Sequence, residues 1–102
     1  MRTEQAITAY CYNRRGQLIS TGKNSYDKTH PLQAYFSKLA NMPEKIFLHA
    51  EMDALLKARG KKIHSIHVVR IGKQGENKLA APCPVCQLAI KAFGVKEITY
   101  TI

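Results

Sequence analysis

Two short motifs far apart in the sequence limit how this chain can fold, because together they form one set of metal ligands. The first is His-Ala-Glu at residues 49–51, and the second is Pro-Cys-Pro-Val-Cys at residues 82–86. One imidazole and two thiols provide three ligands for zinc, which leaves the fourth position of a tetrahedral ion open. An open position is typical of a catalytic site, whereas a fourth Cys or His closes a structural one. A fold that uses both motifs must bring residue 49 next to residues 83 and 86.

Both motifs are expected at the starts of helices. His49 directly precedes one predicted helix, Cys83 precedes another, and Cys86 lies in the first turn of the second. A helix N-terminus carries about half a positive charge and free N–H groups, so it lowers the pKa of nearby thiols. Glu51 is too close in sequence to His49 to be an obvious fourth ligand, and proton transfer is the better interpretation. Zinc in such a site lowers the pKa of a coordinated water to about 7.

A structural role for the two motifs is the main alternative. A Cys-x-x-Cys pair by itself is typical of structural zinc or of a redox pair, and such a zinc site needs a fourth ligand. His30, His64 and His67 could in principle provide one, but none has the required spacing. The ordered combination of three ligands and an acid therefore favours catalysis.

The composition sets limits on compartment and partners. The chain has 102 residues, a formal net charge of +9 and three cysteines. This length suits a single domain, residues 1–102, with a core that needs no disulfides. An odd cysteine count with one Cys-x-x-Cys pair favours a reducing, cytoplasmic location, and the absence of a long apolar run argues against a membrane partner. The positive charge favours a phosphate-bearing partner, either a nucleotide or a nucleic acid.

Hydrophobic periodicity predicts four strands and three helices. Strands are expected at residues 5–12 and 17–21, joined by a tight turn, and again at 63–71 and 97–102. Helices are expected from residue 32 to about 41, from 50 to 59, and from 84 to 93, while residues 22–31 and 73–78 are expected to be loops. The order β-β-α-α-β-α-β predicts a mixed sheet flanked by helices.

The sequence resembles the cytidine deaminase superfamily over nearly its whole length. The basis is the His-x-Glu and Pro-Cys-x-x-Cys signature of zinc-dependent nucleobase deaminases, together with the order of strands and helices. The resemblance implies a three-layer α/β/α fold with a mixed sheet of about four to five strands. It also implies that His49, Cys83 and Cys86 hold one zinc ion and that Glu51 transfers protons. Deaminases of free nucleosides typically have Cys at the position of His49. With histidine there, the chain is more similar to the deoxycytidylate and nucleic-acid branches of the superfamily.

The resemblance also implies substrate contacts. Asn24, in the segment Gly-Lys-Asn, corresponds to an asparagine that contacts the sugar, and Ala50 is expected to line the base pocket through its backbone. Tyr26 is a candidate for stacking on a base, and Pro82 is expected beside the substrate in the second motif. Deoxycytidylate deaminases often have Asn two residues after the glutamate, whereas this chain has Asp53.

Three functions stay open at this point. The first is hydrolytic deamination of cytosine to uracil, with release of ammonia, in a cytidine or deoxycytidine nucleotide. The second is deamination of cytosine or adenine in single-stranded DNA or RNA, which a charge of +9 would favour. The third is a non-catalytic, zinc-stabilised binding module, against which Glu51 argues. Because several relatives have a further strand and helix, assembly into a homo-oligomer is also expected.

Overall fold

The core of the structure is a mixed β-sheet with five strands. The computed structural model describes residues 6–25, 28–42, 48–72 and 74–102. The strands are β1 (Ala6–Tyr12), β2 (Leu18–Lys23), β3 (Ser65–Ile71), β4 (Asn77–Lys78) and β5 (Glu97–Tyr100). Strand β1 lies between β2 and β3 and is antiparallel to both, whereas β5 is parallel to β3.

Strands β4 and β5 share the outer edge of β3. The first half of β3, up to Val68, pairs with β5, and its last two residues, Arg70 and Ile71, pair with β4. Thr101, directly after β5, links the two short strands, because its hydroxyl donates to the Lys78 carbonyl at 2.6 Å. The end of β3 is therefore held by hydrogen bonds from two separate segments.

Alternation along β1 and β3 creates the apolar face of the sheet. Ala9 and Cys11 on β1, and Ile66 and Val68 on β3, are all at most 1% exposed. Their sequence neighbours point to the opposite face, as the period of two in a strand requires. The predicted strands at residues 5–12 and 63–71 are thus found with small shifts of their ends.

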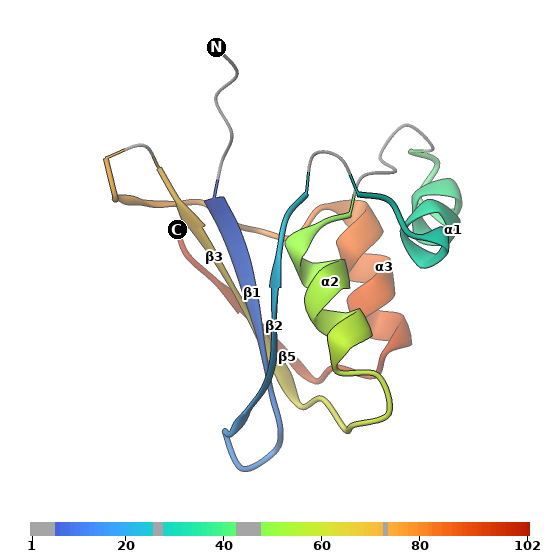
Figure 1. Cartoon of the computed structure of the whole chain (residues 1–102), viewed down its shortest axis with the longest axis horizontal. Helices are drawn as coiled ribbons and strands as arrows, with labels where there is room; N and C mark the ends of the chain where they lie inside the picture. The colour runs from blue at the N-terminus through green and yellow to red at the C-terminus, as the bar shows by residue number, and fades with distance from the viewer. Residues whose placement is uncertain (1–5, 26–27, 43–47, 73) are drawn as a thin grey trace.

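Three helices lie on this side of the sheet (Figure 1): α1 (Pro31–Leu39), α2 (Ala50–Lys57) and α3 (Pro84–Ala92). Figure 1 shows α2 directly against β1 and β2, with α3 and then α1 beside it. Met52 and Leu55 of α2, and Val85 and Ile90 of α3, are at most 1% exposed and form much of the core. Each of the three helices begins with an extended residue, and α1 and α3 begin with the proline that favours a first helical turn.

The mixed α/β class and the number of strands agree with the sequence analysis, but the layering differs. Figure 1 shows all three helices on one side of the sheet, so the described part of the chain has two layers instead of three. The physical reason is that β2, β3 and β5 are parallel and the two crossovers between them run in the same direction across the sheet, so right-handed connections place α2 and α3 on the same face. A third layer would need a further helix on the opposite face, and the residues with described positions contain none there.

Two element boundaries also required correction. Strand β2 continues to Lys23, beyond the predicted end at Thr21, because it keeps pairing with β1 as far as Thr8. The excursion at residues 73–78, predicted as a loop, contains the two-residue strand β4. Both segments join the sheet by pairing with strands that are distant in sequence, and local composition does not predict such pairing.

None of the helices in the described ranges has both the length and the apolar character needed to cross a lipid bilayer.

A close approach between β2 and α2 makes Gly22 a packing requirement. A Cβ atom at Gly22 would lie 2.3 Å from the Ala50 carbonyl oxygen and 2.3 Å from the Ala54 nitrogen. Both are backbone atoms, so the helix itself would have to move. We expect Gly22→Ala to lower the free energy of unfolding by about 1–3 kcal/mol, the usual cost of overpacking. Urea unfolding measures this, and Thr21→Ala, at an exposed neighbouring position, serves as the control with a smaller effect. Equal stabilities of the two variants would contradict the close approach.

Candidate active site

The two helix starts bring the predicted metal ligands together. His49 is the N-cap residue of α2, and its ring makes no capping hydrogen bond to that helix. Cys83 is the N-cap residue of α3, and Cys86 follows in the first turn. Neither the His49 ring nor the Cys83 thiol makes a capping hydrogen bond to its own helix. The ligand groups can therefore meet in the space between the two helix N-termini.

The distances between the ligand atoms suit a single zinc ion. The Nδ1 atom of His49 lies 3.2 Å from the Cys86 sulfur and 3.5 Å from the Cys83 sulfur. All three ligand atoms lie within 4.8 Å of one another. Bonds of about 2.0–2.1 Å to nitrogen and about 2.3 Å to sulfur, at a tetrahedral angle, imply nitrogen-to-sulfur separations of roughly 3.5 Å. The donor set and its spacing both fit, and Nδ1 is the ring nitrogen that faces the sulfurs.

The group contains three ligands among the residues that the structure describes. The other histidines make contacts elsewhere. His30 caps α1, with its Nδ1 accepting from the Leu32 N–H at 3.0 Å. His64 lies 3.6 Å from the Glu97 carboxylate, and His67 lies 2.7 Å from the Thr99 hydroxyl. A three-ligand set is the kind that leaves a coordination position for water or substrate.

The two thiols differ strongly in acidity. A hydrogen bond from Cys86, with further help from His49, lowers the pKa of Cys83 to about 3 although burial opposes this. The same hydrogen bond to Cys83, together with burial, raises the pKa of Cys86 well above its ordinary value. Within this pair, Cys83 is the more acidic thiol and Cys86 the less acidic one. Binding of a dication between them would release the Cys86 proton, because metal ligands must be deprotonated.

Glu51 is a buried carboxyl group beside this cluster. The residue is only 6% exposed, and burial raises the pKa of its carboxyl group, an effect that its own backbone N–H, Cys86 and His49 partly offset. A carboxyl group with a raised pKa holds and releases a proton more readily near neutral pH than an exposed glutamate does. Glu51 is the second residue of α2, and its carboxyl group lies close enough to His49 and Cys86 for both to affect its pKa.

A cavity of about 550 Å³ opens next to these residues, a volume within the usual range for small-molecule sites. It lies at the carboxyl ends of β2 and β3, where α2 and α3 begin, which is the edge of an α/β sheet where ligands usually bind. Its lining includes His49, Glu51 and Cys83 from the cluster. The lining residues outside the cluster come mainly from the sheet edge and from the segments before α2 and α3: Ile7, Asn24, Ser25, Leu48, Ala50, Val68, Arg70, Leu79, Ala80 and Ala81.

The predicted substrate contacts have different places in the structure. Asn24 and Ala50 line the cavity. The side-chain oxygen of Asn24 accepts from the Ile7 N–H at 3.1 Å, so the end of β2 holds this side chain against β1. Pro82 is buried outside the cavity lining, and its carbonyl accepts from the Gln87 side chain at 2.8 Å. Tyr26 lies outside the described residues.

Two residues around the site were not identified from the sequence. Gln33 of α1 is fully buried, and its side-chain oxygen accepts from the His49 N–H at 3.4 Å, so α1 supports the metal-ligand cluster. Arg70 of β3 lines the cavity. A usable signal for Arg70 existed: it continues the inward-facing series Ile66 and Val68, where a charged residue is unusual unless it has a partner.

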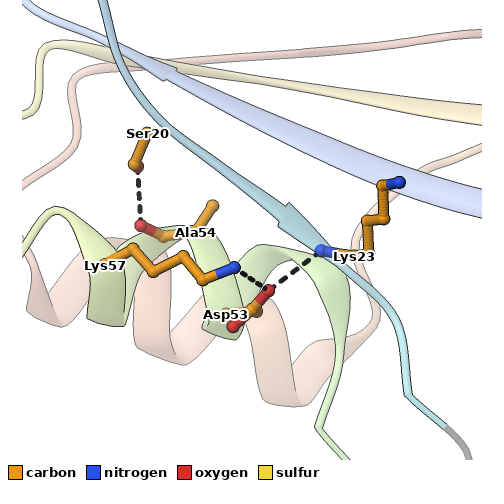
Figure 2. A network of polar contacts seen from close by, with 5 residues as sticks. All are labelled: Ser20, Lys23, Asp53, Ala54 and Lys57. Atoms are coloured by element: carbon orange, nitrogen blue, oxygen red, sulfur yellow. Dashed lines mark hydrogen bonds and ion pairs between the residues drawn. The ribbon is translucent and has the colours of Figure 1, made fainter.

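Asp53 joins β2 to α2, as Figure 2 shows, and is not among the residues that line the cavity. Its carboxylate accepts from the Lys23 N–H at 3.0 Å and contacts the Lys57 ammonium at 3.1 Å, while the Ser20 hydroxyl donates to the Ala54 carbonyl nearby. The departure from the asparagine of deoxycytidylate deaminases therefore lies at a position that connects secondary-structure elements.

We expect Asp53→Ala to lower the free energy of unfolding by about 1–2 kcal/mol, because a hydrogen bond to an ionised acceptor is lost. Asp53→Asn keeps an oxygen for the Lys23 N–H and should cost less. Lys57→Ala is the matched control and should cost about 0.5 kcal/mol or less, as expected for an exposed ion pair one helical turn apart. Urea unfolding of the three variants checks this order, and a larger effect at Lys57 than at Asp53 would contradict it.

Comparison with solved structures identifies the fold. No protein-family model matches the sequence, and no curated protein matches it. Among solved structures, the chain is similar to a Glu-to-Gln mutant of cytidine deaminase from Mycobacterium tuberculosis, with a TM-score of 0.53 and 22% sequence identity. The match covers 94% of this chain and 67% of that one. This chain therefore has the cytidine deaminase fold, and its group of His49, Cys83 and Cys86 has the spacing of residues that could hold one metal ion.

Proposed function

We propose that the protein is a zinc-dependent hydrolytic deaminase that converts the cytosine of a cytidine or deoxycytidine nucleotide to uracil. The observation that carries this proposal is the buried Glu51 beside a three-ligand metal cluster, at the edge of a cavity of about 550 Å³. The fold shared with a cytidine deaminase supports it. The net reaction consumes one water, breaks the bond between the base and its exocyclic amino group, and releases ammonia.

In this proposal His49, Cys83 and Cys86 hold the zinc ion, which when bound supplies Lewis-acid activation of a water molecule. Glu51 accepts a proton from the attacking water and delivers protons to the ring nitrogen and to the departing amine. Its burial suits both steps, because a raised pKa makes the carboxylate a better base and the carboxylic acid easier to retain. The hydrogen bond that the His49 N–H donates to the Gln33 side-chain oxygen supports the start of α2, where both His49 and Glu51 lie.

Asn24 and Ala50 are the proposed substrate contacts. Asn24 is well placed to contact a sugar, because its side-chain oxygen is anchored to β1 while the residue lines the cavity. Ala50, the first residue of α2, can present backbone groups to a base lying against the helix start. Holding the base in one orientation against the reacting groups contributes to the rate by proximity.

A purely structural zinc module explains less of the site. A structural zinc ion has no use for a buried acid beside its ligands, and burying a carboxyl group without a function is costly. A structural zinc site also does not require a cavity that reaches its ligands. Glu51 and the cavity together favour a catalytic site.

The net charge of +9 favours a second candidate, deamination of a base in single-stranded DNA or RNA. In this case phosphate contacts spread over the surface would supply much of the affinity, and one unpaired base would enter the cavity.

Ammonia release by the zinc-loaded protein distinguishes these functions. The substrates are dCMP, CMP, deoxycytidine, cytidine, AMP and a cytosine-containing oligodeoxynucleotide, each at low and high salt. The proposal predicts turnover of a cytosine mononucleotide that depends only weakly on salt. Turnover confined to the oligonucleotide and lost at high salt would support the second candidate. Stoichiometric zinc with no ammonia from any substrate would overturn catalysis.

A further inference from the structure

We propose that Arg70 is the specificity-determining residue of the cavity, and that its guanidinium group binds the phosphate of a nucleoside monophosphate. The inference rests on the proposed function and adds to it the group that would distinguish a nucleotide from a nucleoside. Among the described residues that line the cavity, Arg70 is the one arginine or lysine.

The sheet register places Arg70 in a row with the proposed sugar contact. Arg70 of β3 is the pairing partner of Ile7 of β1, and on the other side of Ile7 stands Asn24, bonded to it through backbone and side chain. All three residues line the cavity. Because neighbouring strands lie about 4.8 Å apart, the backbones of Asn24 and Arg70 are separated by roughly 10 Å across the sheet. A nucleotide can span this interval, with its sugar near Asn24 and its phosphate toward Arg70.

The hydrogen bonding of Arg70 is incomplete without a ligand. One terminal nitrogen, Nη1, donates to the Leu79 carbonyl at 3.3 Å, which holds the side chain against the segment before α3. The Nε atom is buried and has no hydrogen-bond partner within the described part of the chain. Buried polar groups are nearly always paired, so an unpaired donor on a cavity-lining residue calls for an explanation. Because Nε itself is covered by protein atoms, the terminal nitrogen atoms are the donors that a bound anion would contact, and its charge would stabilise the whole guanidinium group.

The chemistry of the guanidinium group favours phosphate as that anion. Its planar set of donors matches two phosphate oxygens at once, and it stays charged at any pH of interest. The base and the sugar of the proposed substrate are neutral and would not compensate the positive charge of Arg70. The cavity volume suits one nucleotide, which favours a monophosphate over a longer strand.

Substrate preference tests the proposal. We measure kcat/KM for dCMP and for deoxycytidine with the wild type, Arg70→Gln, Arg70→Lys and Arg15→Gln. Glutamine can still donate to the Leu79 carbonyl but has no charge. The ratio of the two kcat/KM values does not depend on the folded fraction, so it separates recognition from stability. Arg15, an exposed residue in the β1–β2 turn at the far end of the strands, is the matched control.

The wild type should prefer dCMP, and Arg70→Gln should lower this preference by about 10- to 100-fold, as expected for losing a charged hydrogen bond. Arg70→Lys should lower it less, and Arg15→Gln should leave it unchanged. Calorimetry with dUMP and deoxyuridine gives a readout independent of turnover: Arg70→Gln should weaken only dUMP binding.

Several outcomes would overturn the role of Arg70. These are a wild type that prefers deoxycytidine or the oligonucleotide to dCMP, no measurable binding of dUMP, or an unchanged preference in the Arg70 variants. If Arg70→Gln does not fold, an unchanged preference in Arg70→Lys decides against the proposal. Failure of the proposed function looks different, because ammonia release would then be missing for every substrate while dUMP binding still reports on Arg70.

Discussion

Glu51→Gln is expected to lower kcat for cytosine deamination by about 10²- to 10⁴-fold, the usual contribution of a general acid–base group. Glutamine has nearly the same volume as glutamate but cannot accept or deliver a proton. Because the amide takes up nearly the same space beside His49, we expect the proposed metal ligands to keep their places. Because the amide has no ionisable group, proton transfer is lost. Ammonia release under saturating substrate measures the effect, and metal analysis should still find about one zinc per chain.

Glu97→Gln is the matched control for this change, because Glu97 is exposed on β5 and lies outside the cavity lining. It should leave kcat within a factor of about two, as most surface substitutions have small effects. A Glu51→Gln protein with normal kcat and bound zinc would show that another group transfers the proton. Loss of zinc from Glu51→Gln would instead point to a structural role of the carboxylate at the cluster.

Cys86→Ala is expected to abolish stoichiometric zinc binding and, with it, detectable deamination. Two ligands would be left, and the sulfur that is removed lies 3.2 Å from the His49 nitrogen. The wild type should also lose thermal stability when a strong chelator removes its metal, because a ligand that binds only the folded state stabilises it. Metal analysis and thermal unfolding, each with and without chelator, provide the two readouts. The midpoint of Cys86→Ala should not respond to chelator.

The third cysteine provides the control. Cys11 is fully buried on β1, away from the ligand group, and burial raises the pKa of its thiol. Cys11→Ala removes a buried sulfur atom and should cost about 1 kcal/mol of stability or somewhat more. It should retain its zinc and its response to chelator. Equal zinc loss in the Cys11 and Cys86 variants would contradict the assignment of the ligands.

Much of the secondary structure could be predicted because it follows from the local periodicity of apolar residues. The alternation of Ala9 and Cys11 identifies β1, and the prolines and glycines near the ends of helices mark their limits. Gly60 and Gly94, both with φ near +80°, follow α2 and α3 as expected for residues that end a helix. The same local reasoning placed His49 and Cys83 at helix starts, where the structure has them.

The features that were missed depend on contacts between distant segments. Strand β4 exists because Asn77 and Lys78 pair with the end of β3, and two residues have no detectable period of their own. Gln33 supports His49 across the boundary between α1 and α2, an interaction that neither helix predicts alone. The three-layer arrangement was expected from the resemblance, but the described helices all pack on one face.

By itself the sequence determined which groups could do chemistry here: one imidazole, two thiols and an acid, in an order and spacing that suit zinc. Ligand type and local spacing are chemical properties of the chain, so they can be read without coordinates. The tertiary structure alone decided that these groups lie together, that His49, Glu51 and Cys83 line one cavity, and that Arg70 lines it too. It did so because sheet register and helix packing, which act between residues far apart in sequence, set which side chains share a space.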